Sequence, residues 1–128
     1  MEYFKRKTVQ GMLKVNLEDV KKAEEVLKSI VKETPLQESK ELSAKLGANV
    51  YYKCENLQKT GSFKIRGASN KIAALVERGE ITSAVASSAG NHAQGVAYAS
   101  HVHNIPATIV MPKSAPIAKV SATEGYGA

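Results

Sequence analysis

A lysine at the predicted start of a helix is the residue of this chain best suited to chemistry. Lys64 lies in the segment Lys59–Ala68, where small and hydroxyl residues separate a β-rich run from a helical run. Such a helix start presents free backbone N–H groups and the positive end of the helix dipole, where acidic residues are more common. Lysine forms Schiff bases with carbonyl compounds, and a neighbouring cation such as Arg66 favours the nucleophilic free amine. On the segment alone, the alternative is a surface lysine beside a core residue, Phe63.

A second candidate site is the turn Ser87–Gly95, which follows a short apolar run and leads into another helical run. Its backbone N–H groups and the side chains of Ser88 and Asn91 are suited to binding a carboxylate at the helix start. A P-loop is excluded, because the residues that follow the turn are Val and Ala rather than Lys and Ser or Thr. The alternative is a purely structural turn, in which His92 caps the helix.

The elements that must position these segments form a predicted α/β fold, a parallel sheet with flanking helices. A helix is expected from Leu17 to Lys32, with Asn16 as N-cap and Thr34-Pro35 ending it. A shorter helix at Ser39–Leu46 ends at Gly47, which suits a left-handed cap. After it, β-rich and helical runs alternate, which is typical of a parallel sheet. The expected strands are Val50–Cys54, Ala84–Ser87 and Ala107–Met111, and the expected helices are Ile65–Arg78, His92–His103 and Ile117–Tyr126.

Composition is that of an ordinary globular domain. The 128 residues are 43% hydrophobic and 23% charged, which amounts to about one domain. No apolar run approaches the roughly 18 residues that a transmembrane helix needs. The charged opening Met1–Thr8 is not followed by an apolar region, so no secretory signal is expected and the predicted location is the cytoplasm.

The basic residues do not indicate a nucleic-acid-binding protein. The net charge is +6, but many of the basic residues in the first part of the chain alternate with glutamates on an amphipathic helix. Two phenylalanines and no tryptophan leave little to stack on bases. A metal site is not expected either, because His101 and His103 do not share a helical face and no other His or Cys lies at ligand spacing.

Taken together, the segments resemble one family, the pyridoxal-phosphate-dependent threonine/serine dehydratases, or threonine ammonia-lyases. Lys53–Ala68 resembles the family's cofactor-lysine signature, and Ser88–Gly95 resembles its substrate-carboxylate loop. The run Met-Pro-x-x-Ala-Pro-x-x-Lys that ends at Lys119 also matches, and the resemblance extends in order and spacing from Leu17 to the end. It implies the β-family, or fold type II, architecture of pyridoxal-phosphate enzymes. On that basis residues 1–48 are a helical lead-in belonging to the large domain, and residues 49–128 are most of the small α/β domain without its last strand.

The resemblance also implies residue roles. Lys64 carries pyridoxal 5′-phosphate and, once freed, takes the Cα proton of the substrate. Phe63 packs against the pyridine ring, and Asn91 hydrogen-bonds the ring hydroxyl. The expected reaction converts L-threonine or L-serine to a 2-oxo acid and ammonia. The residues expected to bind the substrate carboxylate are Ser88, Ala89, Gly90, Asn91 and His92.

Two alternatives accompany this interpretation. Related serine racemases carry a serine directly before Gly-Asn-His as a second base, and Ala89 at that position favours dehydration over racemisation. No two glycines are adjacent, so the glycine-rich phosphate loop of the family is missing and the chain is expected to be an amino-terminal fragment. The other alternative is therefore a truncated, non-catalytic module. For the full-length enzyme the resemblance implies a homo-oligomer that acts in isoleucine biosynthesis or threonine catabolism.

Overall fold

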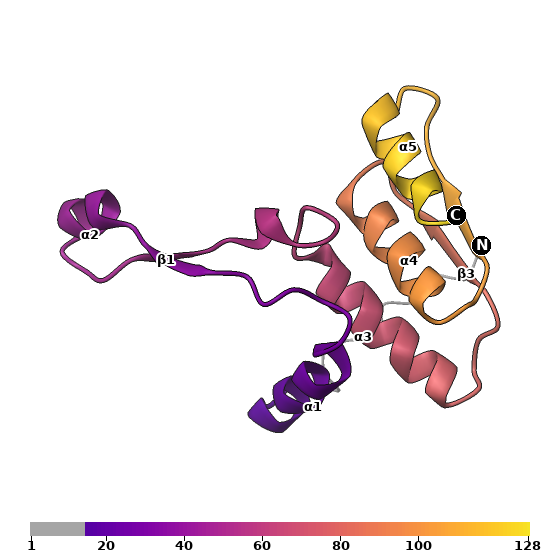
Figure 1. The fold of residues 1–128 in the computed structure, drawn as a ribbon, viewed down its shortest axis with the longest axis horizontal. Coiled ribbons are helices and arrows are strands. Elements are labelled where there is room, and N and C mark those ends of the chain that lie inside the picture. Colours follow the sequence, from indigo (N-terminus) through magenta and orange to yellow (C-terminus); the bar gives the residue numbers. More distant parts are fainter. Residues whose placement is uncertain (1–14) are drawn as a thin grey trace, which may run out of the picture.

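The computed structural model describes residues 15–128, so the expectation for Met1–Thr8 lies outside the described residues. Figure 1 shows a body of helices on a small sheet and an arm that projects away from it. The body consists of α1 (Leu17–Leu27), α3 (Lys64–Glu77), β3 (Ala84–Ser87), α4 (Asn91–Val102), β4 (Ala107–Val110) and α5 (Ile117–Gly125). The arm consists of β1 (Leu36–Glu38), α2 (Lys40–Leu46) and β2 (Tyr51–Lys53), and the 3-10 helix η1 (Glu55–Leu57) joins it to α3.

Local capping explains where the first two helices begin and end. Asn16 is the N-cap of α1, as predicted. It also forms a reciprocal pair of hydrogen bonds with Asp19, which makes a capping box. The helix ends at Leu27, earlier than the expected Lys32. Ser39 caps α2, which ends at Gly47 with a φ of 63°, so the predicted left-handed cap is confirmed.

The arm differs from the predicted topology. β2 pairs with β1 in an antiparallel ladder that sets Leu36 opposite Lys53, and neither strand joins the parallel sheet. The expectation that Val50–Cys54 belongs to the parallel series is therefore wrong. β2 has a different partner because Leu36–Glu38, which was not predicted to be a strand, lies beside it in the opposite direction and forms its backbone hydrogen bonds. The ladder also crosses the predicted boundary between residues 48 and 49, and the domain division stays a prediction.

The body has the predicted parallel βαβ arrangement. β3 and β4 are parallel in the register Ala84 to Ala107, and α4 connects them and packs on one face of the pair. α3 packs along α4, and α1 contacts α3 (Figure 1). The core lies between these layers and consists of Ala68, Ile72, Val96 and Ala99, with partly buried Val76, Ile81, Ala84, Ala86, Ile105 and Ile109 against it.

The other face of the two-stranded sheet is open within residues 15–128. Alternation along the strands directs Ala84 and Ala86 to the core, while Val85 is 74% exposed and Val110 is 56% exposed. The expected flanking helices therefore cover only one face of the described sheet.

Among the described residues no helix is long and apolar enough to cross a bilayer. The same residues contain no group of three or more His, Cys, Asp or Glu side chains placed to hold a metal ion.

Candidate functional site

Lys64 is the first residue of α3, and its side chain is exposed. Phe63 precedes it at the N-cap position, where no side chain caps the helix. Ile65, the next residue, is fully buried and anchors this turn in the body. The loop before it turns at Gly61, which has a φ of 68° and accordingly favours glycine. The sequence thus places a lysine amine in solvent on a first turn that its neighbours hold rigidly.

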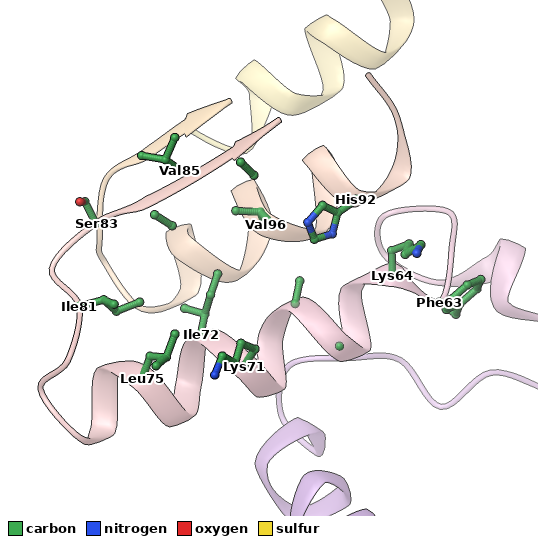
Figure 2. A pocket seen from close by; sticks show the side chains of 14 residues that line it. Phe63, Lys64, Lys71, Ile72, Leu75, Ile81, Ser83, Val85, His92 and Val96 are labelled. Carbon is green, nitrogen blue, oxygen red and sulfur yellow. The ribbon is translucent and has the colours of Figure 1, made fainter. Parts of the chain in front are cut away.

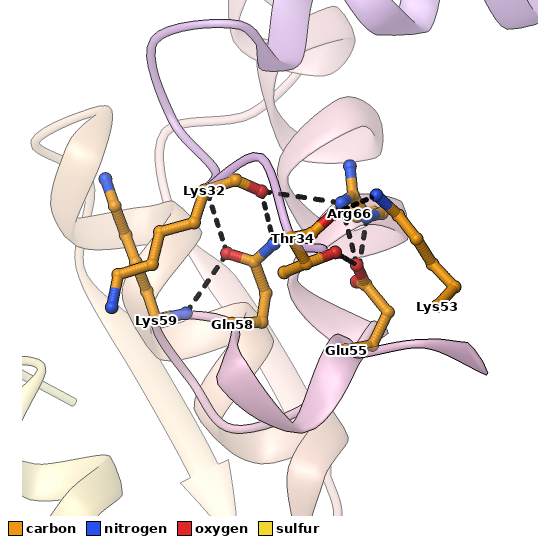
Figure 3. Close-up of polar contacts among 7 residues, drawn as sticks. All are labelled: Lys32, Thr34, Lys53, Glu55, Gln58, Lys59 and Arg66. Atoms are coloured by element: carbon orange, nitrogen blue, oxygen red, sulfur yellow. Dashed lines mark hydrogen bonds and ion pairs between the residues drawn. The ribbon is translucent and has the colours of Figure 1, made fainter. Parts of the chain in front are cut away.

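Gln58 fixes the loop that leads to this lysine. Its side chain is 4% exposed and forms two hydrogen bonds with the backbone of Lys32: the Lys32 N–H donates to Oε1 at 2.8 Å, and Nε2 donates to the Lys32 carbonyl at 2.8 Å. The N–H of Lys59 donates to the same Oε1 at 3.1 Å. These bonds, drawn in Figure 3, attach the segment after α1 to the turn before Lys64. Sequence reasoning did not find this role, because Lys32 and Gln58 are far apart in the chain.

A partly buried ion pair holds the same turn from the other side (Figure 3). Arg66 donates from Nε to Glu55 Oε2 and from Nη2 to Glu55 Oε1, both at 2.8 Å, and the Glu55 side chain is 15% exposed. The hydroxyl of Thr34 also donates to Glu55, and the ammonium of Lys53 donates to the Thr34 carbonyl at 2.6 Å. The hydrogen bond from Arg66 is the main reason that the pKa of Glu55 falls from 4.5 to about 2. In turn the carboxylate raises the pKa of Arg66.

This pairing changes the role expected for Arg66. The sequence suggested a neighbouring cation that favours the free amine of Lys64. In the structure the guanidinium is engaged by a carboxylate in a two-point contact, so its charge is largely balanced where it lies. Arg66 is therefore better described as a clamp on the first turn of α3 than as an electrostatic activator of the lysine.

Lys64, Phe63 and His92 line one end of a groove of about 570 Å³ that runs between α3 and the β3 side of the body. Figure 2 shows these three side chains near one another, with Lys71, Leu75 and Ile81 farther along the groove. The Nζ atom of Lys64 lies 5.3 Å from the centroid of the Phe63 ring, and that ring is 59% exposed. The structure thus brings together the predicted cofactor lysine, the predicted ring-packing residue and one predicted carboxylate-binding residue.

The rest of the predicted carboxylate loop surrounds the start of α4 and does not line that groove. The N–H of Ser88 donates to the Val110 carbonyl at 3.1 Å, and the N–H of Gly90 donates to Ser88 Oγ at 3.3 Å. Gly90 is the N-cap, and no side chain caps the helix, so the suggestion that His92 is a capping residue is wrong. The first N–H groups of α4 have no acceptor within the helix and can bind an anion.

Gly95 allows α4 to pack closely against the first turn of α3. A Cβ atom at this position of α4 would lie 3.1 Å from the carbonyl oxygen of Lys64 and 3.2 Å from its carbonyl carbon. These separations are tighter than most Cβ contacts, so a larger residue here would require α3 or α4 to shift by a few tenths of an ångström. The start of α4 is thereby held beside the first turn of α3.

These features fit half of a pyridoxal-phosphate site. An exposed lysine amine beside an exposed aromatic ring suits attachment and packing of the cofactor, and an uncapped helix start suits a carboxylate. The phosphate needs a further anion-binding loop. No two glycines are adjacent in the sequence, so this chain does not supply a glycine-rich loop of that kind.

Comparisons with known proteins agree with this chemistry. A family described as "Pyridoxal-phosphate dependent enzyme" matches residues 27–128. The chain is 55% identical over 114 residues to the L-threonine ammonia-lyase of Thermotoga maritima, covering 89% of this chain and 28% of that protein. It is 53% identical over 110 residues to the L-threo-3-hydroxyaspartate ammonia-lyase of a Pseudomonas species, covering 86% and 34%. The crystal structure of a pyridoxal 5′-phosphate-dependent aspartate racemase superposes with a TM-score of 0.83 at 40% identity, covering 92% of this chain and 37% of that one. The chain therefore spans about a third of the length of the relatives it matches.

Proposed function

The chain belongs to the family of pyridoxal-phosphate-dependent enzymes and has part of their fold type II architecture, and on this premise we propose that it forms part of an ammonia-lyase. The proposed reaction converts L-threonine or L-serine to a 2-oxo acid and ammonia. The observation that carries the proposal is the placement of the turn that bears the exposed Lys64 beside the uncapped helix α4, at the contact of Gly95 with the Lys64 backbone. The 55% identity to a threonine ammonia-lyase supports the choice of reaction.

In this proposal Lys64 has two tasks. Its amine would hold the cofactor, and once it no longer does so, Nζ would accept the proton from the substrate Cα. When bound, pyridoxal phosphate supplies the electron sink that makes this proton acidic. Glu55, Arg66 and Gln58 keep the first turn of α3 in place, so that the amine returns to the same position in each cycle.

The carboxylate of the substrate is bound by the start of α4. The N–H groups of the first turn point toward the anion, and the helix dipole adds a favourable potential. The residues proposed to contribute are Ser88, Ala89, Gly90, Asn91 and His92. Phe63 packs against the ring of the cofactor and Asn91 also hydrogen-bonds its hydroxyl. Holding the carboxylate at a fixed point orients the Cα–H bond toward the Lys64 amine, which is a positioning contribution.

The experiment compares Lys64→Ala with Lys45→Ala in a protein that carries this sequence. Lys45 is an exposed lysine of α2 whose contact is Glu41, so it controls for loss of a surface charge. With pyridoxal phosphate and L-threonine, 2-oxo acid formation should fall by roughly a thousandfold in Lys64→Ala, because the proton acceptor is gone, and change little in Lys45→Ala. Equal activity of the two variants would contradict the proposed role of Lys64.

A racemase is the second candidate function. The aspartate racemase with a TM-score of 0.83 favours it, because it shares this part of the fold at 40% identity. Against it stands Ala89, which has no group able to deliver a proton to the opposite face of Cα. Elimination is therefore the favoured outcome.

The setting of the enzyme follows from the same premise. We propose a cytoplasmic homo-oligomer that takes a small amino acid as substrate and takes part in isoleucine biosynthesis or threonine catabolism. We also propose the domain division at residues 48 and 49, with the helical lead-in belonging to the large domain. The strands β1 and β2, which lie on either side of that division, would then connect the two domains.

A further inference from the structure

The side chain of Lys119 reaches the carboxylate loop from a different element. Its Nζ atom donates a hydrogen bond to Asn91 Oδ1 at 2.8 Å, although the two residues are 28 positions apart. Lys119 lies in the first turn of α5, where its N–H donates to the Pro116 carbonyl at 2.8 Å. Its carbonyl accepts a hydrogen bond at 2.8 Å from Thr123, which is 3% exposed. The backbone that carries the lysine is therefore held at both its N–H and its carbonyl.

The chemistry of the two groups fixes the orientation of the Asn91 amide. An ammonium has only donors, whereas a carboxamide has an acceptor oxygen on one side and an NH2 donor on the other. Only the oxygen of Asn91 can therefore face Lys119. The Nδ2 group must then point to another side, and within residues 15–128 no hydrogen bond engages it.

We propose that Lys119 is a positioning residue that orients the Asn91 amide, so that Nδ2 donates to an acceptor oxygen of the ligand at the start of α4. The inference rests on the proposed function, which places a carboxylate and the cofactor's ring hydroxyl near Asn91. The carboxylate and the ring oxygen of the cofactor can each accept a hydrogen bond, so a donor at this position suits either ligand. Without Lys119 the amide can turn over and present its own oxygen, which repels that ligand.

The test measures ligand affinity without catalysis. The probe is pyridoxamine 5′-phosphate, titrated calorimetrically into a protein that carries this sequence with Lys64→Ala, so that binding is not covalent. Lys119→Met removes the donor, Lys119→Arg keeps one, and Lys113→Met removes an exposed positive charge earlier in the same segment. Each substitution at position 119 is made alone and together with Asn91→Ala, which gives a double-mutant cycle.

The expected result is a loss of affinity of about tenfold for Lys119→Met, consistent with one hydrogen bond to a charged partner. Lys119→Arg should restore most of it, and Lys113→Met should change it little. In the Asn91→Ala background Lys119→Met should have no further effect, because the residue through which it acts is gone. An unchanged affinity for Lys119→Met, or an equal loss in both backgrounds, would overturn the inference, since the second result shows a charge that acts independently of Asn91.

A ligand-free measurement separates this inference from the proposed function. If the parent protein does not bind pyridoxamine phosphate, the proposed function fails. The inference is then tested by the NMR signal of the Asn91 side-chain amide in a 15N-labelled protein. That signal should shift in Lys119→Met and stay close to the parent position in Lys119→Arg. An Asn91 signal that is the same in the parent and in Lys119→Met would show that the lysine does not orient the amide.

Discussion

Replacing Gly95 with alanine should push apart the two helix starts that form the candidate site. The added Cβ would lie 3.1 Å from the Lys64 carbonyl oxygen and 3.3 Å from the Ile65 nitrogen. These contacts are tighter than most Cβ contacts, so the neighbouring backbone must shift by a few tenths of an ångström. Such overpacking costs about 1–3 kcal/mol. The new methyl also adds about 1 kcal/mol of helix propensity, and a net loss of up to about 2 kcal/mol remains.

Gly67→Ala is the matched control for that substitution. Gly67 lies within α3, and a Cβ atom there would have no neighbour within 4 Å, so the gain in helix propensity should appear without a clash. The free energy of unfolding should rise by about 1 kcal/mol for this control, which leaves the two variants about 1–3 kcal/mol apart, the cost of the overpacking.

Urea denaturation followed by circular dichroism measures both variants. The expected order of stability is Gly67→Ala, then the parent, then Gly95→Ala. If Gly95→Ala stabilises the protein as much as Gly67→Ala does, the close contact with the Lys64 backbone does not constrain the site, and the reasoning is wrong.

Two further predictions concern the clamp on α3 and the choice of reaction. Glu55→Gln should lower the free energy of unfolding by up to roughly 3 kcal/mol at neutral pH, which corresponds to the fall in pKa of Glu55 from 4.5 to about 2. Because the pKa of Glu55 is depressed in the folded state, its contribution to stability is present above about pH 4.5 and decreases to roughly 1.5 kcal/mol near pH 3. Denaturation of the parent and of Glu55→Gln at several pH values measures this decrease. A stability difference between the two that does not depend on pH would contradict the ion pair. Ala89→Ser should increase racemisation of L-serine relative to elimination, since a hydroxyl then stands where a second base is needed; chiral chromatography of the recovered substrate measures it, and an unchanged ratio would remove Ala89 from the argument.

The parts of the fold that local chemistry determines were predictable from the sequence. Asn16 begins α1 and Gly47 ends α2 as expected, because a cap depends on residues within one turn. The parallel pair β3 and β4 followed from apolar runs separated by a helix. The antiparallel partner of β2 was missed. Leu36–Glu38 has three residues, all exposed, and no apolar alternation that could predict a strand.

Residue types predicted the residues of the candidate site, but they did not predict the contacts that hold those residues in place. Lys64 was recognised because a lysine is unusual at a helix start, and Asn91 because a small polar turn there can bind a carboxylate; their proposed roles stay predictions. The partners of these residues depend on contacts between distant segments. Gln58 reaches Lys32 across 26 positions, and Lys119 reaches Asn91 across 28, so no local pattern could indicate either contact. The pairing of Arg66 with Glu55 was not predicted for the same reason, because it depends on the turn between them.

The most direct test of the account is to locate the lysine that reacts with pyridoxal phosphate. The purified protein is incubated with the cofactor and reduced with borohydride, and the pyridoxyl-labelled peptides are identified by mass spectrometry. The account predicts that Lys64 carries most of the label, because it is the exposed lysine held beside Phe63 and His92 at the end of the groove. Label spread evenly over the surface lysines, or absent from Lys64, would contradict the central claim.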